Sequence, residues 1–295
     1  MLIPLLRTMR PRQWPKNGFV FVALLFDRQV DQADSVLRAV IAFILLSLMS
    51  SAVYIMNDLV DIESDRQHPK KRSRPLPAGE LSPTVATAAA FLFAAGSLAA
   101  GFVLAPIFGW ILLGYLLTQI AYTFWLKHVV LIDVSVVATG FILRIAAGVA
   151  VLPDVERFSP WLYIFGGFLA LFLALGKRRH ELVLLGAEAG NHRAILNEYS
   201  LELIDRLIGI VTTSAIVAYS LYTFLAEGLP GNHVMMLTIP FVIYGMFRYL
   251  YLIHIRHEGG APEEILLRDR PMQVALALWA TLVFVALYIL PGSTS

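Results

Sequence analysis

Cysteine is absent from this sequence, and charged residues are scarce. Asp, Glu, Lys and Arg make up 15% of the 295 residues, whereas a soluble globular chain usually carries about 25%. Without cysteine there is no disulfide, no thiolate metal ligand and no cysteine nucleophile, so a bound metal would need carboxylate, amide or histidine ligands. So small a share of charged side chains excludes a disordered chain and a soluble nucleic-acid-binding protein.

Hydrophobic residues are abundant instead. They form 58% of the chain and recur in runs close to the ~20 residues that a membrane-spanning helix needs. Backbone polar groups in lipid must be hydrogen-bonded within the segment, so these runs predict helices. We therefore expect an all-α, polytopic membrane protein with one catalytic domain over residues 1–295. The first run also fits a half-span or an interfacial segment. The nine predicted transmembrane segments are 12–27, 35–57, 83–104, 107–126, 129–151, 160–176, 206–226, 234–254 and 272–290.

The charged residues predict the orientation. Basic residues gather at the N-terminus and in the breaks that follow segments two, four, six and eight, whereas the alternate breaks are mostly acidic. Because cytoplasmic loops carry the excess of Lys and Arg, the basic side is expected to face the cytoplasm. The N-terminus is then cytoplasmic and the C-terminus outside, which agrees with an odd number of crossings. We expect a multi-pass protein of the cell (plasma or inner) membrane with its polar chemistry on the cytoplasmic face.

The most informative polar residues stand in the first long cytoplasmic break. Asn57, Asp61 and Asp65 are spaced by four residues and are expected to share one helix face, and Asp58 lies three before Asp61. Carboxylates at this spacing repel one another unless a cation lies between them. Oxygen ligands of this type suit Mg²⁺, which binds through a few carboxylates together with substrate phosphates. The alternative is a solvated, charge-rich loop, which leaves this register at a membrane boundary unexplained.

A basic run follows, and its cations are suited to phosphate groups. The whole stretch, NDLVDIESDRQHPKKRSRPLPAG over residues 57–79, resembles the first aspartate-rich signature of the UbiA-type intramembrane prenyltransferase superfamily. That resemblance implies a bundle of nine transmembrane helices. It also implies that the Asn/Asp motif holds Mg²⁺ against a diphosphate in a cavity open to the cytoplasm and the lipid. Asp58 and Asp61 are the expected catalytic residues.

The second signature departs from the ordinary members of that superfamily. Relatives that use prenyl diphosphates carry another aspartate-rich stretch after the sixth helix, where this chain has LGKRRHEL over residues 175–182. The pattern is similar instead to the decaprenyl-phosphate phosphoribosyltransferases. Their matching stretches are RPRQWPKN at residues 10–17, LK at 126–127, LIDV at 131–134, GKRR at 176–179 and LRDRP at 267–271.

The resemblance to this branch implies two substrates, phosphoribosyl diphosphate as donor and a polyprenyl (decaprenyl) phosphate as acceptor, with a use in cell-wall arabinan synthesis. Cations pair directly with phosphates, so replacing carboxylates by Lys and Arg suits these two anionic substrates. The expected donor-phosphate ligands are Lys70, Arg74, Lys177, Arg178 and Arg179.

The acceptor phosphate is assigned to Arg12 and Lys16, although both also fit simple anchoring to anionic lipid. Tyr122 is expected to line the cavity or to anchor at the interface. Other candidates for substrate binding are Lys127, Asp133 and Glu181. Asp133 is expected to bind a ribose hydroxyl, to orient Lys127 or to form a structural salt bridge, and Glu181 is expected to orient the arginines or to join the metal ligands.

Arg144 is expected to lie about 22 Å along its helix from the cytoplasmic end, at ~1.5 Å per residue, and so to snorkel or to bond another helix. Three other functions stay open: a prenyltransferase with an aromatic acceptor, a transporter and a non-catalytic scaffold. A transporter would show internal repeats and charges near mid-membrane, and we see no clear repeat. The sequence does not indicate an oligomeric state.

Overall fold

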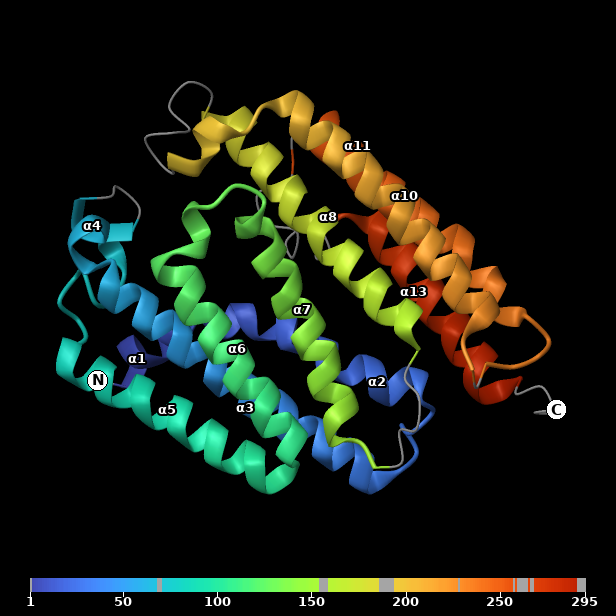
Figure 1. Ribbon diagram of the computed structural model, residues 1–295, viewed down its shortest axis with the longest axis horizontal. Coiled ribbons are helices and arrows are strands. Elements are labelled where there is room, and N and C mark those ends of the chain that lie inside the picture. Colours follow the sequence, from blue (N-terminus) through green and yellow to red (C-terminus); the bar gives the residue numbers. More distant parts are fainter. Residues whose placement is uncertain are drawn as a thin grey trace. The chain divides into compact units, whose positions relative to one another are not determined.

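The computed structural model describes residues 2–67, 71–153, 159–185, 194–227, 229–256, 258, 265 and 268–290, and those residues contain helices and no strand (Figure 1). The chain divides into two compact units. Unit 1 comprises Met1–Phe124 and Leu143–Val155, and unit 2 comprises Trp125–Ile142 and Glu156–Ser295. The boundary falls within helix α7 (Ile132–Val151), and each unit is described by itself. The prediction of one catalytic domain stays a prediction.

Unit 1 is built around the 28-residue helix α3, against which α1, η1, α5 and α6 pack. Its core is formed by residues such as Leu46, Met49 and Phe108, which are almost fully buried. Pro83 in the first turn of α5 and Pro106 at the start of α6 occupy positions where a helix has no need of the backbone N–H. The elements of unit 1 are α1 (Leu2–Met9), η1 (Pro11–Val20), α2 (Phe21–Phe26), α3 (Ala33–Val60), α4 (Ile62–Gln67), η2 (Lys71–Ser73), α5 (Pro83–Leu104) and α6 (Pro106–Phe124).

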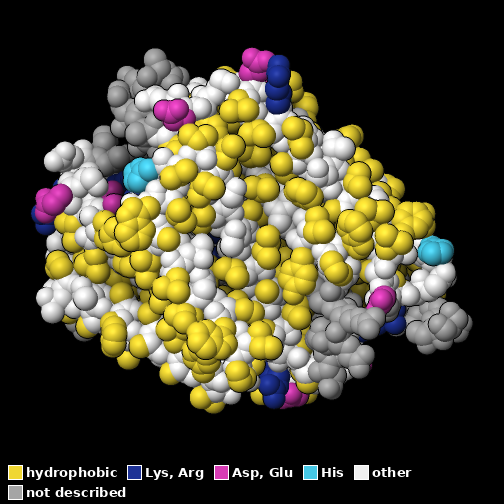
Figure 2. All heavy atoms as spheres, in the orientation of Figure 1, with side chains coloured by type: hydrophobic (Ala, Val, Ile, Leu, Met, Phe, Trp, Pro, Cys, Tyr) yellow, Lys and Arg dark blue, Asp and Glu magenta, His cyan; other side chains and the backbone are white. Residues whose placement is uncertain are grey.

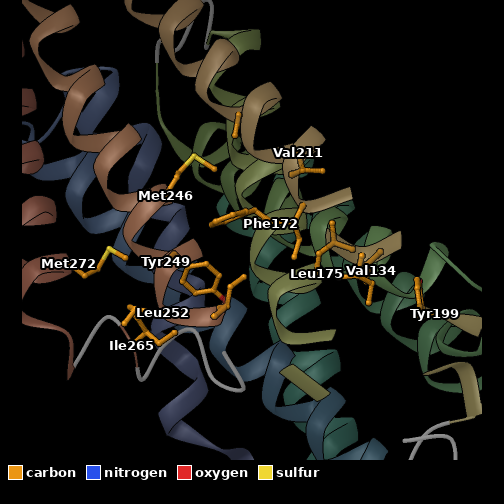
Figure 3. Packing of buried hydrophobic residues seen from close by; sticks show 14 of the residues in the cluster. Val134, Phe172, Leu175, Tyr199, Val211, Met246, Tyr249, Leu252, Ile265 and Met272 are labelled. Carbon is orange, nitrogen blue, oxygen red and sulfur yellow. The ribbon is translucent and has the colours of Figure 1, made fainter. Parts of the chain in front are cut away.

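Unit 2 packs α8 along α10, and α11 along α13 (Figure 1). Its core is shown in Figure 3. Within this core the ring centroids of Phe172 and Tyr249 are 5.0 Å apart. Asp269 begins α13 by accepting a hydrogen bond from the Met272 backbone N–H at 2.8 Å. The elements besides the start of α7 are η3 (Leu126–His128), α8 (Pro160–Leu185), η5 (Ala194–Glu198), α10 (Leu201–Leu225), η6 (Val234–Thr238), α11 (Ile239–His254), α13 (Arg270–Phe284) and the π-helix η7 (Val285–Ile289).

Eight helices in the described part of the chain are long and apolar enough to cross a membrane. They correspond to predicted segments two to nine, so the chain is a multi-pass membrane protein. Much of the surface seen in Figure 2 is hydrophobic. On α5 and α6 the exposed side chains include Phe91, Val103 and Trp110, as expected where the surrounding solvent is lipid.

The first predicted segment, 12–27, is not a single spanning helix. It consists of the 3₁₀-helix η1, which contains Pro15, and the six-residue helix α2. A Cβ added to Gly148 on α7 would lie 2.1 Å from the Val20 carbonyl oxygen, so η1 ends in direct backbone contact with α7. The expected count of nine spans is thus not confirmed in the described residues, and the orientation of the termini stays a prediction.

Candidate functional site

Asp58 and Asp65 form the centre of a charged cluster in unit 1. Asp58 lies in the last turn of α3 and Asp65 on α4, and both residues are almost fully buried. One nitrogen of Arg74, Nη1, lies 3.1 Å from Asp58 Oδ1 and 2.6 Å from Asp65 Oδ2. The two carboxylates are therefore close enough to share a single cation.

Two further cations complete this aspartate cluster, which we define as Arg10, Asp58, Asp65, Lys71 and Arg74. Arg10 Nη2 donates to the same Oδ1 of Asp58 that accepts from Arg74. Lys71 Nζ lies 3.5 Å from Asp65 Oδ1. The three basic side chains are 30–43% exposed, whereas the two carboxylates are at most 3% exposed. The carboxylates are thus fixed inside the unit while their cations reach the surface.

Arg10 has a role that the sequence alone did not indicate. It links α1 to η1 with a left-handed backbone (φ 53°), and its guanidinium lies 5.2 Å from the centroid of the Tyr54 ring. A non-glycine residue rarely adopts this conformation, so the contacts of its side chain hold it there. The available signal was its place at the start of the RPRQWPKN stretch.

The predicted helix register is only partly right. Helix α3 ends at Val60, and Asp61 stands at the break before α4. The carboxylates that share a cation are Asp58 and Asp65, which lie seven residues apart on the two sides of this break. The Asn57 side chain accepts a hydrogen bond from the Thr123 hydroxyl at 2.6 Å. The Asp61 side chain is half-buried and has no hydrogen bond or ion pair within the described residues.

The chemistry of the aspartate cluster suits Mg²⁺. Two buried carboxylates that already share a cation offer the hard oxygen ligands this ion prefers, and Mg²⁺ takes few protein ligands beside water and phosphate. No group of three or more acidic or histidine residues with a geometry for metal binding is present in the described residues. Of the four predicted ligands, Asp58 and Asp65 have carboxylates that contact the same cation, and the assignment of Asn57, Asp58, Asp61 and Asp65 to a metal ion stays a prediction.

A second charged cluster lies in unit 2 and is more deeply buried. Asp133, in the first turn of α7, accepts hydrogen bonds from Arg178 Nε at 3.1 Å and from the Tyr199 hydroxyl at 2.6 Å. Arg178 also donates to Glu181, one turn further along α8. Asp133 is 0% exposed and Arg178 5%. We call these four residues the Asp133 cluster.

Tyr199 was not singled out from the sequence, where nothing marks it. Its hydroxyl donates to Asp133 and accepts a hydrogen bond from the Leu131 backbone N–H at 2.7 Å. Leu131 has a left-handed backbone (φ 66°), so Tyr199 fastens a strained turn between Lys127 and α7. Burial first, and then the hydrogen bond to Asp133, raise the pKa of Tyr199 to about 12. The phenol is therefore neutral at physiological pH.

The three cations of the GKRR stretch have different surroundings. Lys177 is exposed and has no ion pair within the described residues. Arg178 belongs to the Asp133 cluster. Arg179 Nε lies 2.7 Å from Asp205 Oδ1 on α10. The same oxygen of Asp205 lies 3.3 Å from His254 Nε2. Of the three, Lys177 is the side chain open to an incoming phosphate.

The remaining predicted residues differ in how exposed they are. Arg12 on η1 is exposed and has no hydrogen bond or ion pair within the described residues, whereas Lys16 on η1, Tyr122 on α6 and Lys127 on η3 are half-buried. Lys70 lies outside the described residues. The assignment of Arg12 and Lys16 to an acceptor phosphate stays a prediction.

Arg144 forms hydrogen bonds to other helical segments of unit 1, which was one of the two roles expected for it. Its Nε donates to Asn17 Oδ1 at 2.8 Å and its Nη2 to the Tyr115 hydroxyl at 3.1 Å. The amide of Asn17 donates in turn to the hydroxyls of Ser47 and Ser50 on α3. Because Arg144 is buried, the alternative of snorkelling does not hold.

A model of the UbiA prenyltransferase family matches residues 18–265. The chain belongs to the UbiA prenyltransferase family. Over 282 residues this UbiA-family chain is 33% identical to the decaprenyl-phosphate phosphoribosyltransferase of Mycobacterium tuberculosis (strain ATCC 25618 / H37Rv), covering 94% of this chain and 92% of that protein. The enzyme of the same name from Corynebacterium glutamicum is 32% identical over 301 residues, which cover 97% and 87% of the two chains.

Solved structures agree with the UbiA fold. A UbiA homolog from Archaeoglobus fulgidus bound to GPP and Mg²⁺ has a TM-score of 0.74 and 20% identity over 96% of this chain and 99% of that one. The same homolog bound to DMAPP and Mg²⁺ also gives 0.74. The family model and the full-length relatives thus make this chain a membrane-embedded enzyme of the transferase class.

Proposed function

We propose that this protein transfers a 5-phosphoribosyl group from phosphoribosyl diphosphate to a polyprenyl phosphate and releases diphosphate. The observation that carries the proposal is the similarity to decaprenyl-phosphate phosphoribosyltransferases along 94% of the chain. The charged clusters support it, because the polar residues of both units include cations that suit phosphate groups.

The aspartate cluster is assigned to the donor's diphosphate. Asp58 and Asp65 would hold Mg²⁺, which supplies charge neutralisation on a diphosphate leaving group when it is bound. Arg74 and Lys71 reach the surface beside these carboxylates and are suited to pair with phosphate oxygens, as Lys70 is by its place in the sequence. Each of these residues binds and orients; none of them exchanges a proton.

In unit 2, Lys177 and Lys127 have no ion pair in the described residues, and we assign both to phosphate binding. Asp133 and Tyr199 position the turn that follows Lys127 rather than contacting substrate, since both are buried in mutual hydrogen bonds. Arg12 and Lys16 are assigned to the acceptor phosphate.

The reaction forms a bond between an acceptor phosphate oxygen and C1 of the ribose, while the C1–oxygen bond to diphosphate breaks with its electron pair. The acceptor phosphate is already anionic near neutral pH, so no general base is required. The protein accelerates the reaction by positioning two anionic substrates and by offsetting their charge. We place this chemistry on the cytoplasmic face of the cell membrane and assign the product to cell-wall arabinan synthesis.

The test is a transfer assay with purified protein, Mg²⁺ and polyprenyl phosphate. Labelled phosphoribosyl diphosphate is offered in one reaction, and a prenyl diphosphate with 4-hydroxybenzoate in another. We expect label in the lipid fraction only from the phosphoribosyl donor. Transfer from the prenyl donor alone would overturn the proposal and establish an aromatic prenyltransferase.

The role of Asp61 is decided separately by Asp61→Asn. If Asp61 is a metal ligand, its replacement abolishes Mg²⁺-dependent transfer. If activity and Mg²⁺ dependence both survive, the metal is held without it, by the two buried carboxylates.

A further inference from the structure

We propose that Arg74 is an exchangeable counter-ion that competes with the metal ion for Asp58 and Asp65, so that diphosphate and metal each strengthen the binding of the other. The inference rests on the proposed function for the presence of a diphosphate and Mg²⁺ at this cluster. It adds a coupling between the two binding equilibria, which follows from the contacts of a single side chain.

The competition follows from geometry. A single N–H nitrogen of Arg74 bonds one oxygen of each carboxylate, at 3.1 and 2.6 Å. Mg²⁺ binds its oxygen ligands at about 2.0–2.1 Å and requires a near-octahedral arrangement. An ion bridging the same two oxygens would occupy the place of the Arg74 nitrogen. Arg74 and the metal ion are therefore alternative partners for one pair of carboxylates.

The two aspartates are enclosed by the fold, whereas Arg74 reaches the surface. Asp58 and Asp65 belong to α3 and α4 and are buried, so neither can turn to water when its cation leaves. Arg74 lies just after η2, and its side chain is 30% exposed. Its guanidinium can leave by rotation of its own side chain, without movement of a helix.

A phosphate group offers Arg74 equivalent partners. A guanidinium pairs with phosphate through two parallel N–H bonds, as it does with carboxylate. When diphosphate binds Arg74, the two aspartates lose a cation and gain affinity for a metal ion. By linkage, the metal ion raises the affinity for diphosphate by the same factor. The free protein should accordingly bind divalent ions weakly.

The experiment titrates full-length protein in detergent with Mn²⁺ alone, detected by electron paramagnetic resonance. Arg74→Gln is expected to bind Mn²⁺ about 5- to 150-fold more tightly than the wild type, the usual range of coupling between sites. The control is Arg66→Gln, which removes the same charge from the same stretch, because Arg66 pairs only with exposed Glu63 in the described residues. Mn²⁺ affinity in Arg74→Gln no higher than in Arg66→Gln would overturn the proposal.

Two further variants locate the effect. In Arg74→Gln, an added Asp65→Asn should abolish the gained Mn²⁺ affinity; if it does not, the ion binds elsewhere and the proposal fails. Arg74→Lys keeps the positive charge, and with it the wild-type charge balance, but has one compact donor group. We therefore expect its Mn²⁺ affinity to lie between those of the wild type and Arg74→Gln.

The reverse measurement uses labelled inorganic diphosphate in the presence of a chelator. Arg74→Gln should weaken metal-free diphosphate binding at least about fivefold, opposite in direction to its effect on Mn²⁺. An arginine that only supports the fold would weaken both, which would overturn the proposal. Neither titration contains ribose or lipid, so an enzyme that proves to use another diphosphate donor would still show both effects.

Discussion

The aspartate cluster of unit 1 and the Asp133 cluster of unit 2 join acidic and basic side chains in opposite ways. In the first, buried carboxylates are paired with basic side chains that are about one-third exposed. In the second, carboxylate and guanidinium are both buried, and a tyrosine fills the remaining hydrogen-bonding position. A cation near the surface can be exchanged for a metal ion or can turn to a phosphate, whereas a cation enclosed with its partner cannot leave without leaving a buried charge unpaired.

This difference in burial separates residues suited to binding substrate from residues that position other side chains, even within one sequence motif. Lys177 and Arg178 are adjacent in sequence, yet one is exposed and the other is enclosed by Asp133 and Glu181. We therefore expect substitutions in the aspartate cluster to change activity with little change in stability, and substitutions in the Asp133 cluster to change stability first.

The largest effect is expected from Asp58→Asn and Asp65→Asn. Loss of a metal-binding carboxylate should lower kcat/KM for phosphoribosyl transfer by at least about 100-fold, since even outer-sphere changes at metal sites cost 10- to 100-fold. The freed arginines reach water, so the melting temperature should change little. Transfer kinetics check the predicted loss of kcat/KM, and thermal unfolding in detergent checks the predicted melting temperature. Wild-type activity in both variants would show that the aspartate cluster does not bind the metal ion.

Arg178→Leu should act in the opposite way. It leaves the Asp133 carboxylate buried without its guanidinium, which should lower the free energy of unfolding by about 3–5 kcal/mol. The double variant Asp133→Leu, Arg178→Leu should recover part of the loss, because no buried charge then lacks a partner. Unfolding measurements on the three proteins decide this. If Arg178→Ala instead raises the donor KM without loss of stability, Arg178 contacts the donor as the sequence suggested.

Tyr199→Phe removes one hydroxyl from the same cluster and keeps the ring. The loss of hydrogen bonds to Asp133 and Leu131 should destabilise the protein by about 1–3 kcal/mol, because buried groups are left unpaired. Hydrogen exchange at the Leu131 amide should become faster. An unchanged exchange rate would mean that Tyr199 does not fasten this turn.

The pH dependence of the same pair has a defined sign. The pKa of Tyr199 is raised to about 12 in the folded protein, above about 10 for an ordinary tyrosine. Its contribution to stability is therefore complete below pH 10 and declines as the pH rises towards 12. The difference in unfolding free energy between the wild type and Tyr199→Phe should shrink over that interval, and a difference that grows would contradict the assigned protonation state.

The smallest effect is expected at the surface. Arg66→Gln breaks an exposed i,i+3 pair with Glu63 and should change the unfolding free energy by less than about 0.5 kcal/mol. Its activity should equal that of the wild type. A loss comparable to that of Asp65→Asn would show that any charge in this stretch matters, and the distinction between the clusters would disappear.

The sequence predicted the fold better than it predicted contacts. Long apolar runs require helices in lipid, so eight of the nine predicted segments are helices long and apolar enough to span. The first segment, 12–27, for which a half-span or interfacial segment was the alternative, is a 3₁₀-helix followed by a short α-helix, and Pro15 and the backbone contact with Gly148 favour that form over a straight span. A contact between backbones so far apart in the chain leaves no periodic pattern in the sequence.

The candidate site was predicted in its composition but not in its pairing. Asp58 and Asp65 were named from their helical spacing, yet the partner that unites them, Arg74, was assigned only to phosphate. Arg10 and Tyr199 were missed because their partners, Asp58 and Asp133, lie 48 and 66 residues away. No local pattern reports such pairs.

The sequence by itself determined that this chain crosses the membrane as helices, that its acidic and basic residues gather in a few polar breaks, and that those breaks resemble the UbiA family. These properties follow from local composition and spacing. Only the tertiary structure decided which charges meet and how deeply each is buried. Burial sets whether a cation can exchange its partner, and burial depends on the helices packed around a residue rather than on its neighbours in sequence.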